Sequence, residues 1–195
     1  TGKDNVAFCG YHGWHDWYLA STLNNSRALE TQLMADLKSE GVPKFLKGTS
    51  FPFRYNNISE LKKIIKQNKI GVIIMEVSRN IPPKDNFLQK VKNIAKKNNI
   101  VLIFDECSSG FRETYGGINI KYNVNPDIII FGKALGNGYA INAIVGKKSV
   151  MRNIDNTFIS STFWTERIGY AAGIATLKEM KRLQSWKIIS KKGDY

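Results

Sequence analysis

Cysteine and histidine are scarce in this sequence, with two of each among 195 residues: Cys9, Cys107, His12 and His15. The cysteines stand far apart and form no Cys-x-x-Cys pair, which excludes a disulfide-stapled fold and predicts two reduced thiols. The two imidazoles are three positions apart, but no further set of cysteine or carboxylate ligands accompanies them. We therefore expect no metal site.

Long apolar runs are also missing. No run reaches the roughly 20 residues that a membrane-spanning helix needs. The first residues, Thr1-Gly2-Lys3-Asp4-Asn5, contain neither the basic nor the apolar region of a signal peptide. We expect a cytoplasmic protein without a membrane partner. The chain has no initiator methionine, and we expect it to be part of a longer protein.

Acidic residues are few: 16 Asp and Glu stand against 29 Lys and Arg, which gives a net charge of +13. Such an excess can indicate a nucleic-acid or anionic-membrane partner. However, Lys, Asn and Ile, which A/T-rich codons favour, make up 63 of the 195 residues, and the lysines are scattered along predicted helix faces. There is no arginine-rich arm and no basic and aromatic platform. We interpret the charge as solvated helix faces and expect no nucleic-acid partner.

Continuous apolar segments rich in β-branched residues are typical of strands buried on both faces of a sheet. Segments with helical spacing of apolar residues separate them. This alternation predicts an α/β fold with a mostly parallel sheet and helices on both faces. The predicted strands are residues 6–9, 70–75, 100–104, 127–131 and 143–145, the last of them antiparallel or at an edge.

The helical segments have recognisable beginnings. Ser59 and Asp85 each precede a helical pattern and are predicted to be its N-cap. Residues 16–24 could form one short helix, and residues 41–57 are expected to be a loop with room for an edge strand. An Ala-rich helical pattern then runs from Phe163 to Leu183.

Polar or aromatic residues follow four of the predicted strands. Tyr11 and His12 come after the first, Glu76 after the second, Asp105 after the third and Lys133 after the fourth. Ligands of open α/β sheets bind beyond the carboxyl ends of the strands. We therefore expect these side chains to gather at one edge of the sheet.

Lys133 is the strongest candidate for chemistry. The segment after it, residues 134–138 (ALGNG), is small and apolar. It is expected to leave the amine partly desolvated, as suits a Schiff-base nucleophile. A solvated lysine, and an Asp105 that merely caps a loop, are the plain alternatives. A nucleotide-binding loop is disfavoured because the glycines near Lys133 do not follow a phosphate-loop pattern.

Three segments carry a recognisable combination of motifs: residues 10–13 (GYHG), 105–112 (DECSSGFR) and 126–138 (PDIIIFGKALGNG). Together they resemble the class III pyridoxal-phosphate-dependent aminotransferases, most closely the glutamate-1-semialdehyde aminomutase branch. The separation of 28 residues between Asp105 and Lys133 fits that family. The resemblance covers nearly the whole chain. It implies the fold type I large domain, pyridoxal 5′-phosphate (PLP) as cofactor, and a homodimer acting on a small-molecule amino donor and a carbonyl acceptor.

The resemblance also implies roles for two residues in the chemistry. Lys133 resembles the lysine that holds the cofactor aldehyde and moves a proton between substrate and cofactor carbons. Asp105 resembles the carboxylate that keeps the pyridine nitrogen protonated, which makes the ring an electron sink.

Five further residues are implied to contact the cofactor. Tyr11 resembles the aromatic ring stacked on the cofactor face, with His12 beside it. Cys107 occupies a position where the family usually has Val, and is expected to pack on the opposite face. Glu76 matches a strand-end glutamate kept near the site. Thr162 resembles a threonine that reaches the cofactor phosphate of the neighbouring subunit, and its plain alternative is a helix N-cap.

Two segments depart from the aminomutase pattern: residues 77–81 lack the usual Pro and Gly-Asn step, and residues 164–167 replace a Gly-Asn-Pro-like segment. The expected function is amino-group transfer by an aminotransferase or aminomutase, possible settings being sugar, polysaccharide or semialdehyde metabolism. The alternatives are a PLP-dependent decarboxylase or racemase, and a non-catalytic protein that keeps the fold.

Compared with the family, the sequence is short. We expect residues 1–195 to be the central part of the PLP-binding large domain, without the N-terminal segment and the C-terminal small domain. Residues 163–195 are expected to form a long helix leading toward that small domain. We expect this part alone to be inactive, because the family's phosphate loop is not in it.

Overall fold

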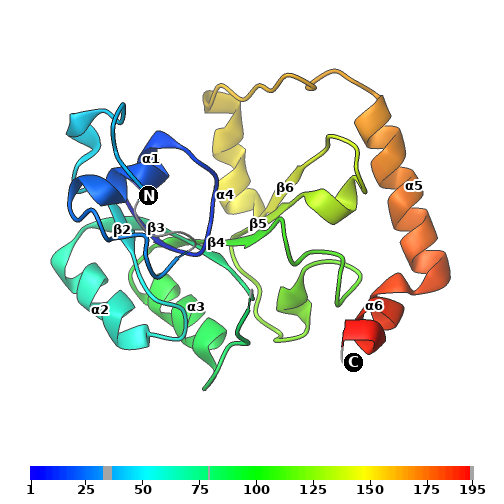
Figure 1. The fold of residues 1–195 in the computed structure, drawn as a ribbon, viewed down its shortest axis with the longest axis horizontal. Coiled ribbons are helices and arrows are strands. Elements are labelled where there is room, and N and C mark those ends of the chain that lie inside the picture. Colours follow the sequence, from blue (N-terminus) through cyan, green and yellow to red (C-terminus); the bar gives the residue numbers. More distant parts are fainter. Residues whose placement is uncertain (33–36, 79, 194–195) are drawn as a thin grey trace. The chain divides into compact units, whose positions relative to one another are not determined.

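The computed structural model describes residues 1–32, 37–78 and 80–193. The chain divides into two compact units (Figure 1). The first unit comprises Thr1–Glu76 and Ile81–Ile103, and the second comprises Val77–Asn80 and Phe104–Tyr195. In hydrogen-bonding order the six strands run β2-β1-β3-β4-β5-β6, so the expected α/β sheet is confirmed.

The first unit is built around β1 (Asn5–Cys9), which pairs in parallel with both β2 (Ser50–Pro52) and β3 (Ile70–Glu76). The register aligns Phe8 with Ile74 and Cys9 with Met75, so β1 and β3 end side by side. Phe8 and Met75 are fully buried, as their apolar runs predict. The short edge strand expected in residues 41–57 is present as β2.

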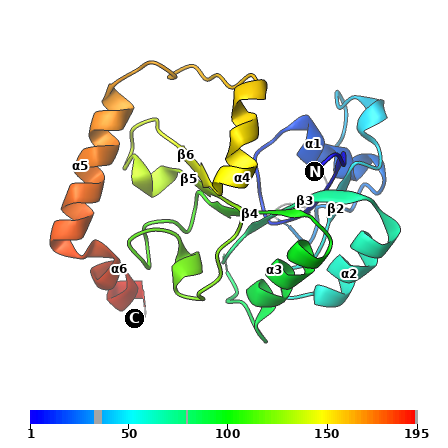
Figure 2. The ribbon, with the colours of Figure 1, turned by 180° about the vertical axis from the view of Figure 1, so that it is seen from behind.

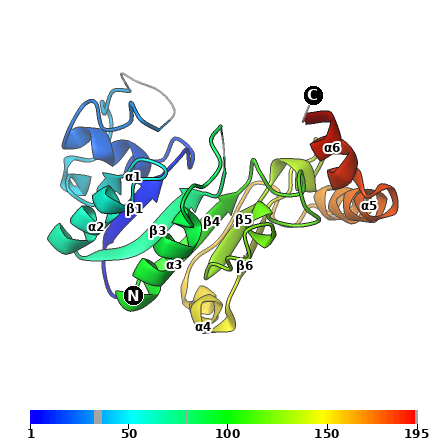
Figure 3. The same cartoon turned by 90° about the horizontal axis from the view of Figure 1, so that it is seen from below.

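Helices cover both faces of the strands of the first unit. Figures 1 and 3 show α2 and α3 on one face and α1 with the 3-10 segment η1 on the other. The apolar stripe of α3 is buried, with Phe87, Val91 and Ala95 each at most 2% exposed. The bounds are α1 (Asp16–Leu19), η1 (Ala20–Leu23), η2 (Lys44–Leu46), α2 (Ile58–Gln67) and α3 (Phe87–Lys97).

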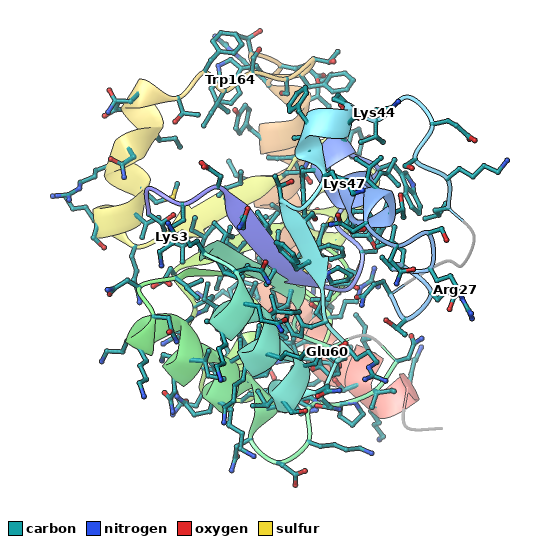
Figure 4. All side chains as sticks on the ribbon, turned by 90° about the vertical axis from the view of Figure 1, so that its left-hand side faces the viewer. Lys3, Arg27, Lys44, Lys47, Glu60 and Trp164 are labelled. Atoms are coloured by element: carbon teal, nitrogen blue, oxygen red, sulfur yellow. The ribbon has the colours of Figure 1, made fainter. Side chains whose placement is uncertain are left out.

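Both predicted helix caps are wrong by one or two positions. The N-cap of α2 is Asn57, whose side chain accepts a hydrogen bond from Glu60 N–H at 3.1 Å, while Ser59 lies inside the helix. Glu60, labelled in Figure 4, also accepts a hydrogen bond from Arg54 N–H at 2.8 Å. The N-cap of α3 is Asn86 rather than Asp85. Unlike Asn57, Asn86 makes no side-chain cap hydrogen bond. The backbone entering each helix decides which residue takes the N-cap position, and spacing alone does not reveal this.

Strand β4 (Val101–Glu106) continues two residues beyond its predicted end. Its side chains alternate: Leu102, Phe104 and Glu106 are buried, and Asp105 between them is half-buried. The two carboxylates at its end therefore point to opposite faces of the strand. Glu106 is the one that enters the core.

In the second unit, β5 (Ile128–Phe131) pairs with β6 (Ala143–Gly146) in antiparallel register, from Ile128 opposite Gly146 to Phe131 opposite Ala143. This confirms the prediction for residues 143–145. The short segments of this unit are η3 (Ile118–Ile120), η4 (Lys133–Leu135), α4 (Lys148–Met151) and η5 (Arg152–Asn156).

The long C-terminal helix is shorter than predicted and is interrupted. Helix α5 (Ile168–Leu183) begins five residues after Phe163 and ends at Gln184, whose φ of 49° is left-handed. Helix α6 (Ser185–Gly193) follows in a new direction (Figure 2). A left-handed residue ends an α-helix because its N–H and C=O leave the helical ladder. Among the described residues, no helix has both the length and the apolar composition needed to cross a membrane.

Candidate active site

The turn after β1 is held by a buried carboxylate from β3. Tyr11 N–H donates a hydrogen bond to Glu76 Oε2 at 3.0 Å. Gly10 has a φ of +104°, and a Cβ on it would collide with the Glu76 carboxylate. The glycine is therefore needed twice, for its backbone conformation and for the close approach of Glu76. Glu76 acts here by fixing the backbone of the turn that carries Tyr11.

Aromatic rings pack around this turn. The ring of Tyr11 lies 4.7 Å from that of Trp14, centroid to centroid, and the hydroxyl of buried Tyr18 donates to Gly10 O at 3.0 Å. His12 is buried as well, with Nε2 at 3.1 Å from Cys9 O. The first unit thus brings together three of the predicted site residues, namely Tyr11, His12 and Glu76.

Asp105 turns the chain at the end of β4. Its Oδ1 accepts a hydrogen bond from Cys107 N–H at 3.0 Å, and the residue is half-buried. An aspartate that bonds the backbone two residues ahead forms an Asx-turn. Asp105 therefore does cap the loop after β4. Its hydrogen bond fixes the direction in which Cys107 and Ser108 leave the strand.

Glu106 organises the loop that follows β4, a role the sequence analysis did not assign to it. Its buried carboxylate accepts hydrogen bonds from Ser109 Oγ at 2.5 Å, Ile118 N–H at 3.1 Å and Asn119 N–H at 3.0 Å. A Cβ on Gly117 would lie 2.8 Å from Glu106 Oε1. Burial raises the pKa of Glu106, and these hydrogen bonds oppose the rise. The alternation along β4 could have revealed Glu106, because a residue two after Phe104 must face the core.

Lys133 begins η4, directly after the turn that ends β5. Its φ of 41° is left-handed, which is uncommon for a lysine and persists where the surroundings fix the backbone. Gly132 before it is buried, and a Cβ there would collide with Asn142 Oδ1 and lie 2.7 Å from Cys107 Sγ. The Lys133 amine donates a hydrogen bond to Ser108 Oγ at 2.5 Å. The backbone before Lys133 and the end of its side chain are thus both held against the loop after Asp105.

The predicted partial desolvation of Lys133 is wrong, because the residue is exposed. The segment after it contains apolar side chains, but Leu135 turns inward and is only 7% exposed. The 3-10 turn therefore buries Leu135 and leaves the lysine outside. Ser108 is a neighbour of Lys133 that the sequence did not indicate, since 25 residues separate the two.

Thr162 lies in a turn before α5 and is exposed. The N-cap of α5 is Arg167, so the helix-cap alternative for Thr162 is wrong. The residues beside it, Ser161 and Phe163, line a pocket of about 470 Å³ within the second unit, together with Ile141 and Tyr170.

A model of the family described as "Aminotransferase class-III" matches residues 6–195. The chain belongs to this family. It is 36% identical over 202 residues to 3-aminobutyryl-CoA aminotransferase of Cloacimonas acidaminovorans, and 37% identical over 198 residues to glutamate-1-semialdehyde 2,1-aminomutase of Nitrosopumilus maritimus. These alignments cover 99% and 97% of the chain. The chain spans 45% of the length of each of these two relatives.

Solved transaminase structures have the same fold. An omega-transaminase from Sphaerobacter thermophilus superposes with a TM-score of 0.78 at 26% identity, over 92% of this chain and 44% of that one. A transaminase solved with PLP bound superposes with a TM-score of 0.76 over 91% of this chain and 44% of that one, and its 18% identity shows the fold alone. PLP is the cofactor that membership of this family implies.

The residues of the second unit fit such a cofactor. The Lys133 amine is exposed, yet it is held in place by Ser108. The half-buried Asp105 is the penultimate residue of β4, the strand next to β5 in the sheet order. An accessible primary amine can condense with an aldehyde, and a carboxylate can bind a ring N–H. The donor set therefore suits PLP.

Proposed function

We propose that this chain is the cofactor-binding part of an enzyme that uses PLP to transfer an amino group from a small-molecule amino donor to a carbonyl acceptor. The observation that supports this most directly is the Lys133 amine, fixed by Ser108 beside the loop that begins at Asp105. Family membership gives the reaction class. Both aminotransferases and aminomutases occur among the relatives, and both reactions remain within the proposal.

Bound PLP would supply an aldehyde that captures amino groups and a ring that withdraws electrons from carbon. Lys133 would hold the cofactor through its amine and, once released by the incoming amino donor, would move a proton. Asp105 would accept a hydrogen bond from the ring nitrogen and keep its proton there.

The remaining predicted site residues enter this proposal as contacts of the cofactor. Tyr11 would stack on one face of the ring with His12 beside it, and Glu76 would hold their turn in place. Cys107 would pack on the other face. Exposed Thr162 would bind the phosphate held by a second copy of the chain, which makes the enzyme a homodimer. Action in the cytoplasm is part of the same proposal.

The experiment that tests the proposal uses the whole protein that contains this chain. It would be incubated with PLP and reduced with borohydride, and the residue that carries the cofactor would be identified by peptide mass spectrometry. Label on Lys133, one of 22 lysines, is expected in the wild type. Lys133→Ala should lose the label and about a thousandfold or more in amino transfer. The exposed Lys148→Ala serves as the matched control and should keep both.

Cofactor attached to another lysine, or unaltered transfer by Lys133→Ala, would refute the proposal. If Lys133 carries the cofactor, a single-turnover screen of amino donors would name the substrate. Release of carbon dioxide or racemisation without amino transfer would instead identify a decarboxylase or racemase. No cofactor binding at all would identify a non-catalytic protein.

A further inference from the structure

Ser108 is the side chain that meets the Lys133 amine. The distance from Lys133 Nζ to Ser108 Oγ is 2.5 Å, and the two residues come from different loops, after β5 and after β4. Because Lys133 is exposed, water could solvate its amine equally well without any protein partner. The contact therefore does not compensate for burial. What it provides is a fixed position for the end of a long, flexible side chain.

The loop that carries Ser108 is itself firmly held. Cys107 N–H on one side of it bonds to Asp105, and Ser108 O accepts a hydrogen bond from Arg112 Nε at 2.6 Å. Gly110 N–H donates to Glu106 O at 2.8 Å. The backbone around Ser108 is thus hydrogen-bonded at Cys107, at Ser108 itself and at Gly110. A side chain on such a loop can hold its partner without much loss of its own freedom.

A hydroxyl suits a partner that changes its protonation. It accepts a hydrogen bond from an ammonium group, and by rotating it donates one to a neutral amine. A carboxylate would also accept from both forms, but its charge would favour the ammonium form, whereas a hydroxyl carries no charge. The Lys133 nitrogen would pass between a charged and a neutral form whenever it moves a proton. Ser108 can therefore stay bonded to it in both forms.

We propose that Ser108 is a positioning residue for Lys133, which keeps the lysine nitrogen beside the loop after Asp105 in both its protonated and its neutral form. The inference rests on the proposed function. The proton stays with Lys133, and the serine neither gains nor loses one. Without the hydroxyl, the Lys133 side chain should sample more conformations. Its nitrogen should then be less often in the position where it attaches the cofactor and transfers a proton.

The test compares Ser108→Ala with Ser108→Thr, which keeps a hydroxyl, and with Ser149→Ala at an exposed position in α4 as the matched control. The first measurement is the rate at which borohydride fixes PLP on Lys133 at limiting PLP, relative to the other lysines. Ser108→Ala should slow this labelling about tenfold, since bonds to charged groups are worth roughly that much or more. Ser108→Thr and Ser149→Ala should label within about threefold of wild type.

The second measurement is steady-state kinetics of the same variants. Ser108→Ala should lower kcat about tenfold with KM changed by less than about twofold, because the lost contact orients the lysine and does not bind substrate. Thermal unfolding should be unaltered in all variants, which excludes misfolding as the cause.

The outcomes separate the two proposals. Wild-type label away from Lys133 would overturn the proposed function, and the role of Ser108 with it. Wild-type label on Lys133 together with wild-type behaviour of Ser108→Ala would overturn the role of Ser108 alone. Failure of Ser108→Thr to restore labelling and kcat would also overturn it, since the hydroxyl would then not be the group that matters.

Discussion

Two loops of the molecule are each fixed by a buried strand-end glutamate, but in different ways. In the turn after β1, Glu76 accepts a hydrogen bond from Tyr11 N–H, the Tyr18 hydroxyl donates one to Gly10 O, and aromatic rings pack around Tyr18. In the loop after β4, Glu106 makes three hydrogen bonds that reach as far as Asn119. The first turn is short and rich in aromatic rings, whereas the second loop is long and its buried glutamate collects hydrogen bonds from residues up to 13 positions away.

The difference follows from what each loop must present. A turn that presents a ring can be stabilised by other rings, because aromatic side chains pack favourably edge to face. The loop after β4 buries Ile118 and Val124, and the ring of Phe111 packs on that of Phe131. Its first residues, Cys107 and Ser108, have small side chains, and there the hydrogen bonds accepted by Glu106 add to the apolar packing.

The largest effect is expected at Asp105, the carboxylate on the other face of β4 from Glu106. Asp105→Asn should slow the half-reaction with an amino donor by on the order of a thousandfold, because a charge that stabilises the reacting ring is lost. PLP binding and the unfolding free energy should change far less. Single-turnover kinetics and PLP titration check this. If Asp105→Asn and wild type had equal half-reaction rates, the reaction would not depend on the charge of Asp105.

Gly10→Ala should have the next largest effect, since it places a methyl group against the Glu76 carboxylate on a backbone with positive φ. Strain and overpacking together should lower the unfolding free energy by about 3 kcal/mol. Gly138→Ala is the matched control, because Gly138 has the same φ of +104° and no atom within 4 Å of its Cβ position. Chemical denaturation of both variants gives the difference. Equal losses would mean that Glu76 does not crowd the turn.

The smallest effect is expected at Glu106, and it depends on pH. Burial raises the pKa of Glu106 above its ordinary value of 4.5, so the folded state binds more protons than the unfolded state between the two values. Stability should therefore fall as the pH rises from 4.5 through the folded pKa. Glu106→Gln cannot ionise and should remove that fall, and it should lower the unfolding free energy by about 2 kcal/mol, because an amide cannot accept all three hydrogen bonds of the carboxylate.

Unfolding free energies measured across this pH range would check the prediction. Exposed Glu40→Gln is the control and should keep the wild-type profile. A Glu106→Gln profile parallel to wild type would mean that another group titrates.

Much of the fold could be predicted from the sequence. The apolar runs predict strands β1, β3, β4, β5 and β6. Burial on both faces explains the run in β3, but β5 is only half-buried and Ile144 and Val145 of β6 are exposed, so the predicted burial of those two strands is wrong. The polar or aromatic residues that follow the runs predict where a site would form, because ligands of open α/β sheets bind beyond the carboxyl ends of the strands. The motifs around Asp105 and Lys133 then predict the family that the comparison confirms.

The ends of the helices depended on the backbone conformation and could not be predicted from residue spacing. The caps at Asn57 and Asn86 and the break at Gln184 depend on φ and ψ values that neighbouring elements impose. Spacing in the sequence indicates that a helix exists, but not which of several polar residues lies within reach of its first N–H groups.

The contacts of the candidate site were decided by tertiary structure alone. The sequence singles out Lys133, yet its exposure and its bond to Ser108 arise only when the loops after β4 and β5 come together. Glu106 likewise gains its role from the return of Ile118 and Asn119 to the end of β4. A hydrogen bond needs atoms within about 3 Å of each other, and for residues far apart in the chain that distance is fixed by the fold, not by the order of residues.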